Sequence, residues 1–575
     1  MRRVLSWRVS TLVSGAGLLA VACQGKPGVE PATLVLHRGK LVTVDDQKPE
    51  AQALAARGDT IVAVGSNDEI APYVGSQTRV VDLGGRLAIP GFIEGHGHFT
   101  GVGRARIILN LMNVKNWDEV VAMVKEAAAK ARPGEWIHGR GWHQDKWDRK
   151  PDPSVEGFPV HRSLSQASPD NPVVLGHASG HAAFANAKAM AVAGITRKTP
   201  NPPGGEILKD KSGEPTGLFR ETADGLLEAA YEKARQGMKP EELEAETRRE
   251  VQLADEEALS KGVTSFQDAG SSFQTVDVFK KVASEGKLGL RLWVMIRDSN
   301  ERLASNLAPY RLVDGYNKHL TIRAIKHTLD GALGSRGAWL LEPYSDLPSS
   351  TGLNTTPLAT VEETARLAMA HGYQLCVHAI GDRANRETLD LFESAFKANP
   401  EKRDLRWRIE HAQHLNAAEI PRFAPLGVIA SMQGIHCTSD AVFVPARLGA
   451  ERSEEGAYVW QKLMRSGAVV TNGTDAPVED VDPIASFYAT VTRKLKDGSS
   501  FYPDQRMTRA EALRSYTYNA AYAAFEEGSK GTLTVGKLAD VTVLSRDIMT
   551  IPEQEIRDAR TDLTIVGGTV LYERR

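Results

Sequence analysis

Two histidines one residue apart, His96 and His98, are the first residues whose types and spacing suggest chemistry. In an extended strand, side chains two positions apart point to the same side, so both imidazoles can reach one divalent metal ion. The pair alone is weak evidence, because two polar residues at the end of a strand would give the same pattern. It gains weight because other potential ligands recur farther along the chain.

Four further candidate ligands end later apolar runs or lie within them: Lys326, His378, His411 and Asp475. Any one of them could be a structural polar group. Together they would place nitrogen and oxygen ligands around one rim, which is the ligand set that Zn²⁺ or a similar divalent ion requires. The sequence therefore predicts a divalent metal centre, with zinc as the favoured ion.

Lys326 admits two interpretations. A buried lysine without a partner loses its charge more easily, and the neutral amine can react with carbon dioxide to form a carbamate that bridges two cations. The alternative is an ion pair with a nearby carboxylate such as Asp330. The local segment favours the ion pair, whereas the other candidate ligands favour the carbamate.

The elements that must position these residues alternate apolar runs with helical patterns, which predicts parallel strands covered by helices. The eight runs are Leu87–His98, Val263–Ala269, Leu290–Ile296, Ile322–Asp330, Gln374–Ile380, Arg406–Gln413, Val428–Gln433 and Ala468–Asp475. One helix between them is predicted to begin at Pro240 and to stop before Gly262. The fold class is therefore α/β, a (β/α)₈ TIM barrel whose catalytic side chains lie at the C-terminal ends of its strands.

Both ends of the chain differ from this middle, because they consist of short extended runs separated by turn residues. We expect residues 32–87 and 531–575 to form one small β-sandwich domain built from both chain ends. The barrel would then span residues 88–530. An insertion at about residues 100–253 is too long for an ordinary connection and is predicted to form a lid or side lobe.

The first residues resemble an export signal. Residues 1–22 combine a basic start with an apolar stretch too short to span a bilayer, and they end just before Cys23, as in the lipobox of bacterial lipoproteins. We expect an exported bacterial protein, periplasmic or attached to the outer membrane by lipidation at Cys23. Plain secretion is the alternative. Only Cys376 and Cys437 remain, too few for a disulfide framework.

The charge balance limits the partners. The chain carries 70 basic and 72 acidic residues, so no long-range field favours nucleic acid. We expect a small-molecule substrate, no nucleic acid, and a membrane contact only through a lipid anchor. Nothing in the sequence indicates an oligomeric state.

Three segments together resemble the amidohydrolase superfamily, in particular the amidohydrolase family 3 branch that includes N-substituted formamide deformylase-like proteins. They are Pro90–His98, Arg408–Gln413 and Gly531–Asp540. The resemblance implies hydrolysis of a carbon–nitrogen bond, other than a peptide bond, by metal-activated water. It covers nearly the whole chain after the export signal and specifies the fold better than the substrate.

Carried over residue by residue, the resemblance implies that His96, His98 and Asp475 hold one metal and that His378 and His411 hold another. Carboxylated Lys326 would bridge the two, although one zinc with an idle second site stays open. Asp475 would also be the catalytic proton shuttle. Glu94 and Thr474 replace the aspartate and serine that are common beside these ligands, and neither change removes a ligand.

Four residues are predicted to contact the substrate: His181, His177, Trp142 and Arg336. The first three lie in the insertion, where Gly176–His181 resembles a family segment that faces the substrate, and His181 is preferred to His177. Arg336 follows the fourth strand. Ordinary loop, packing or surface roles are the alternatives for all four.

Two other functions compete with amide hydrolysis. A deaminase of the same superfamily would share the barrel and most ligands, but it usually carries a glutamate near the fifth-strand histidine, where Ala379–Asp382 stand here. A catalytically silent, lipid-anchored binding protein would be expected to have lost a ligand. All six candidate ligands are present, which favours an enzyme without proving one.

Overall fold

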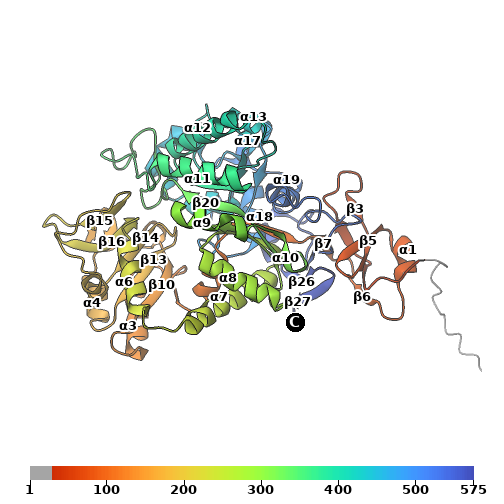
Figure 1. Ribbon diagram of the computed structural model, residues 1–575, viewed down its shortest axis with the longest axis horizontal. Helices are drawn as coiled ribbons and strands as arrows, with labels where there is room; N and C mark the ends of the chain where they lie inside the picture. Colours follow the sequence, from red (N-terminus) through yellow and green to blue (C-terminus); the bar gives the residue numbers. More distant parts are fainter. Residues whose placement is uncertain (1–28) are drawn as a thin grey trace, which may run out of the picture.

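The computed structural model describes residues 29–575 and arranges them in three parts (Figure 1). A barrel lies in the centre, a lobe formed by the insertion lies at one end, and strands from the two chain ends lie at the other. The predicted export signal and Cys23 are outside the described residues. No helix within residues 29–575 is long and apolar enough to cross a membrane.

Eight parallel strands form the barrel, and each predicted apolar run overlaps one of them. In spatial order they are β8 (Phe92–Gly97), β17 (Val263–Ser271), β18 (Arg291–Ile296), β20 (Leu320–Thr328), β21 (Gln374–Ala379), β22 (Arg408–His411), β23 (Ile429–Ser431) and β24 (Val470–Thr471). The last strand meets the first where the Gly95 amide donates to the Asn472 carbonyl at 3.1 Å. The predicted α/β barrel is therefore confirmed.

Helices cover the outside of the barrel strands, as the apolar runs require. The predicted helix is α7 (Pro240–Ser260), which begins at its proline and buries Val251, Ala254 and Ala258 on one face. It ends just before Gly262, whose φ of +84° suits glycine best. Further covering helices include α8 (Phe273–Ser284), α11 (Leu358–His371) and α12 (Asp382–Ala398).

The first apolar run serves two different sheets. β7 (Leu87–Pro90) pairs with strands from the chain ends, and only β8 belongs to the barrel. Gly91 separates them and lies against β17, where a Cβ atom would come within 2.1 Å of the Thr264 hydroxyl oxygen. A continuous apolar run cannot reveal such a change of partner, because both halves are buried.

Two further sheets contain the chain ends. A four-stranded sheet from the N-terminal part has the order β5 (Thr60–Gly65), β4 (Ala53–Arg57), β1 (Leu34–His37) and β6 (Arg79–Asp82). A six-stranded sheet has the order β27-β26-β25-β7-β2-β3, in which β2 is Lys40–Val42 and β3 is Glu50–Ala51. β25 (Val541–Leu544), β26 (Thr561–Val566) and β27 (Thr569–Glu573) come from the C-terminal end. A shared apolar core includes Leu34 and Leu54 from one end and Val541 and Leu563 from the other.

The insertion has its own six-stranded sheet, with the order β15-β16-β14-β13-β10-β9. Its inner and edge strands include β10 (Ile137–Trp142), β13 (Val173–His177), β14 (Ala182–Ala185) and β15 (Gly205–Lys209). It extends from β9 (Leu109–Asn110) to β16 (Pro215–Glu221) and is followed by α6 (Gly225–Arg235). Helix α7, which the predicted boundary included, instead packs on α2 (Phe99–Ala105) and on α8 beside the barrel. The lobe therefore lies between two helices of the barrel layer.

Candidate metal centre and cavity

The six predicted ligands meet at the C-terminal ends of five barrel strands. Ligand atoms of His96, His411 and Asp475 all lie within 4.8 Å of one another. The rings of His378 and His411 are 4.5 Å apart between centroids. His98 Nε2 lies 3.2 Å from Asp475 Oδ1, and Lys326 Nζ lies 3.4 Å from His96 Nε2. In the structure, His411 therefore lies beside His96 and Asp475. The resemblance instead assigns His411 to the other metal site, together with His378.

Unsatisfied buried atoms show that these residues fit a cation. His378 Nε2 and Asp475 Oδ1 are buried, and neither has a hydrogen-bond partner among residues 29–575. Burial, together with the positive charge of Lys326, lowers the pKa of His96 to about 4. Burial also lowers the pKa of His378 and His411 well below the usual value, so all three imidazoles are neutral. Neutral imidazoles and an ionised carboxylate form a ligand set for zinc or a similar ion.

His96 is oriented from behind by a buried chain of polar residues. Its Nδ1 hydrogen-bonds to Glu410 Oε2, and Arg408 Nε lies 2.7 Å from the other oxygen of Glu410. Burial alone would raise the pKa of Glu410, but Arg408 and His96 hold it well below the usual value. A carboxylate that accepts from Nδ1 leaves the lone pair on Nε2, which faces the other ligands.

His411 and Asp475 adopt backbone conformations that side chains disfavour. Their φ angles are +77° and +57°, in the left-handed region. Such strain concentrates at functional sites, where the surrounding structure enforces it. Gln433 Oε1 lies 2.7 Å from His411 Nδ1 and holds its ring.

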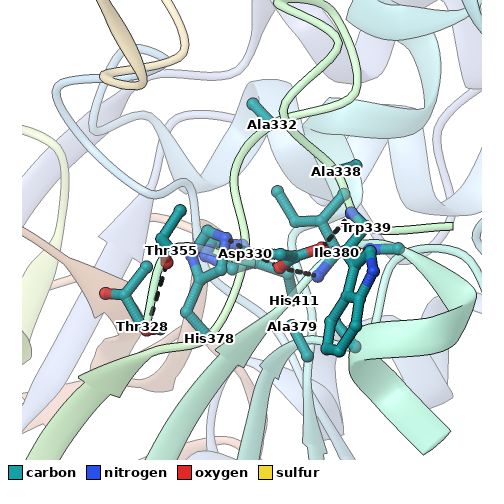
Figure 2. A network of polar contacts seen from close by, with 12 residues as sticks. Thr328, Asp330, Ala332, Ala338, Trp339, Thr355, His378, Ala379, Ile380 and His411 are labelled. Carbon is teal, nitrogen blue, oxygen red and sulfur yellow. Dashed lines mark hydrogen bonds and ion pairs between the residues drawn. The ribbon is translucent and has the colours of Figure 1, made fainter. Parts of the chain in front are cut away.

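Asp330 holds the loop after β20 against the end of β21 instead of pairing with Lys326 (Figure 2). Its two oxygens accept from the amides of Ile380, Gly381 and Trp339 at 2.8–2.9 Å. Burial raises the pKa of Asp330 to about 7 and lowers the pKa of Lys326 to about 8. The local alternative for Lys326, an ion pair with Asp330, is not formed.

Glu94 and Thr474, the two departures from the family pattern, contact each other. Thr474 donates its amide to Glu94 Oε1 at 2.6 Å and its hydroxyl to Oε2 at 3.0 Å. Burial raises the pKa of Glu94 to about 8. The pair joins the first and last barrel strands directly beneath His96 and Asp475.

A cavity of about 560 Å³ opens above the candidate ligands, between the barrel and the insertion. Its wall includes His181, whose Nδ1 lies 2.7 Å from Glu221 Oε2. Burial opposes a charge on His181, but Glu221 raises its pKa above the usual value. The His181 ring lies 4.8 Å from that of His378, so the insertion presents a proton donor to the metal ligands.

A second recess of about 40 Å³ adjoins the same ligands from the other side. His181, His378, His411 and Asp475 line both spaces. The remaining wall of the recess combines apolar residues, such as Leu333, Ile380 and Phe443, with charged ones, such as Lys146 and Asp440. A molecule bound at the ligands would therefore extend into a large space on one side and a small one on the other.

The structure places three predicted substrate contacts away from the cavity wall. Trp142 is fully buried in the core of the insertion, where its Nε1 donates to the Leu175 carbonyl at 2.9 Å. His177 is buried behind the wall and uses its nitrogens on Ser179 and Gln144. Arg336 pairs with Asp346 at 3.0 Å. Of the four predicted contacts, only His181 therefore lines the cavity.

Two residues that line the cavity are absent from the predicted set: Arg140 and Arg297. Arg297 directly follows β18, so its position at a strand end was a signal of the same kind as that of His378. Arg140 lies within β10 (Ile137–Trp142) of the insertion. No sequence pattern marks that position, because the lobe's approach to the barrel depends on tertiary packing.

Comparisons with known proteins agree with this fold and site. The model of the amidohydrolase family matches residues 79–572. The chain is 34% identical to Protein LONG AFTER FAR-RED 3 from Arabidopsis thaliana, over 94% of this chain and 92% of the other. It is 27% identical to N-substituted formamide deformylase from Arthrobacter pascens, over 94% and 98%.

A solved structure extends the likeness to the arrangement in space. An uncharacterized metal-dependent hydrolase from Pyrococcus horikoshii OT3 superimposes with a TM-score of 0.71 at 26% identity, over 91% of this chain and 99% of the other. The chain belongs to the amidohydrolase family and is a metal-dependent hydrolase of that superfamily.

Proposed function

We propose that this protein hydrolyses the amide-type carbon–nitrogen bond of a small N-acyl amine, by metal-activated water. One observation carries the proposal: His378, His411 and Asp475 lie at the boundary between a large cavity and a small recess, and His411 and Asp475 group there with the buried His96. A substrate that spans this boundary would place its scissile bond at the ligands. A pocket with few, convergent polar groups is typical of small-molecule sites.

His96, His411 and Asp475 would hold the cation, with His98 and His378 close enough to take part. When bound, a divalent ion, for which we propose zinc, supplies Lewis acidity that makes water a stronger acid and a carbonyl carbon more electrophilic. Lys326, once carboxylated, would offer two oxygens for a second ion.

Asp475 is the proposed proton carrier. Burial alone would raise its pKa, but the contact with His98 Nε2 holds it well below the usual value, so the carboxylate is ionised and can accept a proton. It would take the proton of the attacking water and return it to the leaving nitrogen. His181, held by Glu221, would donate a hydrogen bond to the bound substrate.

The two spaces differ enough to propose which end of the substrate each one takes. A recess of about 40 Å³ suits a formyl group or another very short acyl group, and the cavity of about 560 Å³ suits the amine portion. The name of one relative, N-substituted formamide deformylase, supports the same assignment. Larger acyl groups would contact Leu333 and Phe443.

A matched substrate series tests this proposal. The protein loaded with zinc should release the amine from N-formyl, N-acetyl and N-butyryl derivatives of benzylamine, with kcat/KM falling about tenfold or more at each step of the series. Amine and ammonia are assayed separately. His96→Ala should abolish the release, whereas His37→Ala, in the terminal sheets, should leave it unchanged. Ammonia from amino-substituted rings, with no cleavage of amides, would support the deaminase instead.

We also propose that the protein is exported and attached to a membrane through Cys23. When the full chain is expressed in a bacterium with an alkyne-tagged fatty acid, the protein should carry the label and sediment with membranes. Cys23→Ser should abolish both, because only the thiol can be lipidated, while Gln24→Ala should keep them. An unlabelled, soluble wild-type protein would instead support plain secretion.

A further inference from the structure

Three arginines line the large cavity without an ion pair to any residue in the range 29–575: Arg104, which lies over the Tyr231 ring, Arg140 and Arg297. Arg140 comes from the insertion and Arg297 from the barrel, and within residues 29–575 neither makes an ion pair. Most other enclosed arginines are paired, for example Arg220 with Glu156 and Glu206, and Arg447 with Asp145 and Asp346. A guanidinium nitrogen that is buried without a partner, as Nη1 of Arg140 is, costs free energy unless a ligand satisfies it.

Arg297 offers its whole guanidinium to the cavity. Its backbone amide donates to the Ser271 carbonyl at 2.9 Å, but its side chain makes no hydrogen bond to any residue of the described chain. Crowding by protein lowers the pKa of Arg297, and the charges of Asp224 and Glu228 only partly offset this effect. The side chain nevertheless stays accessible from the cavity.

The backbone makes room for Arg297 beside Lys326. Gly270, at the end of β17, has a φ of +126°. A Cβ atom there would lie 3.1 Å from Cβ and Cδ of Arg297 and 3.3 Å from Cγ of Lys326. The absence of a Cβ atom at Gly270 therefore lets the side chains of Arg297 and Lys326 extend side by side from neighbouring strands toward the cavity.

Arg140 adds a positive charge from the insertion. Its Nη2 donates to the Ala178 carbonyl at 3.2 Å, and its Nη1 is buried with no partner among residues 29–575. Burial lowers the pKa of Arg140 to about 10, although Asp475 and Glu479 oppose this shift. No ion pair neutralises the charge of Arg140, which therefore interacts electrostatically with Asp475.

We propose that the amine portion of the substrate carries a carboxylate, so that the preferred substrates are N-acyl amino acids whose carboxylate is held by Arg297 and Arg140. The inference rests on the proposed function for the position of the amine portion. A guanidinium binds a carboxylate through charge-assisted, often paired hydrogen bonds. Leu227, Tyr231 and Ile108 on the same cavity wall suit an apolar amino-acid side chain.

The competing explanation is internal. Asp224 and Glu228 also line the cavity, and Arg297 could serve only to balance them. In that case a substrate carboxylate would gain nothing from Arg297, and neutral amides would bind equally well. The two explanations therefore predict different preferences between an acid and its amide.

The test measures binding and turnover separately. Titration calorimetry with methanesulfonyl-phenylalanine and its primary amide, neither of which is cleaved, should give at least tenfold tighter binding of the acid. For N-formyl-phenylalanine against its primary amide, kcat/KM should show the same preference. Arg297→Gln and Arg140→Gln should each reduce it about tenfold or more, and Arg297→Lys should restore part of it. Arg149→Gln, a surface control, should keep it.

Equal binding of the acid and the amide by the wild-type protein would overturn the inference, and so would a preference that survives in either glutamine variant. Tight binding of the acid without cleavage of any amide would instead leave the arginine site standing and remove the proposed function. Calorimetry therefore tests the arginine site, and the cleavage assay tests the proposed function, independently of each other.

Discussion

Asp475→Asn should lower kcat by about two to four orders of magnitude while the protein stays folded. Asparagine has nearly the same size and keeps an oxygen, but it cannot accept the proton of the attacking water. The aspartate is ionised in the native site because the contact with His98 Nε2 outweighs the effect of burial on its pKa. Steady-state kinetics with an N-formyl amine, together with circular dichroism, measure the loss.

Metal content must be measured in the same preparations, because Asp475 is both a proposed ligand and the proposed proton carrier. If the variant keeps its zinc and loses kcat, the proton-transfer role is supported. If activity returns when excess zinc is added, Asp475 acts only as a ligand. Asp482→Asn, at the N-cap of α18 (Pro483–Thr492), is a matched control that should change activity little.

The geometry of the barrel explains which residues of this site could be predicted from the sequence. His96, His378 and His411 end parallel strands, and parallel strands in a barrel bring their C-terminal ends to one rim, so their meeting could be expected. The same rule would have identified Arg297 after β18. The reasoning that predicted the ligands would therefore also have predicted Arg297.

The insertion marks the limit of that reasoning. Trp142 and His177 belong to the same lobe as His181, yet both are buried in the packing of that lobe, with their rings 4.7 Å apart. His181, from the same segment, reaches the cavity because it lies just beyond the turn at Ser179–Gly180. Local sequence cannot distinguish these three positions, because the way in which the lobe contacts the barrel determines which side chains face it.

The terminal sheets show a similar limit. Alternating strands at both ends predicted a shared domain, but β7 and β8 arise from one apolar run and serve two sheets. The division depends on the contact between Gly91 and Thr264, which are far apart in sequence. A pattern of buried residues indicates that a strand is covered on both faces and does not identify its neighbours.

Lys326→Ala should reduce the bound metal to at most one ion per chain and lower kcat/KM by at least about a hundredfold. The physical reason lies in the surroundings of the side chain. Burial lowers the pKa of Lys326 to about 8, so an appreciable fraction is neutral near that pH and can add carbon dioxide. Asp330, the alternative partner, is occupied by three backbone amides.

Metal analysis, mass spectrometry and rescue separate the two roles of Lys326. A carboxylated lysine adds the mass of carbon dioxide to the intact native chain, and bicarbonate during metal loading should raise both metal content and activity of the wild-type protein. Acetate, which supplies two oxygens, should partly restore Lys326→Ala and have no effect on the control Lys261→Ala. If the wild-type protein binds a single ion, carries no added mass and ignores bicarbonate, Lys326 acts as an amine. Its amine, which lies 3.4 Å from His96 Nε2, would then donate hydrogen bonds to the substrate or to water beside a single metal ion.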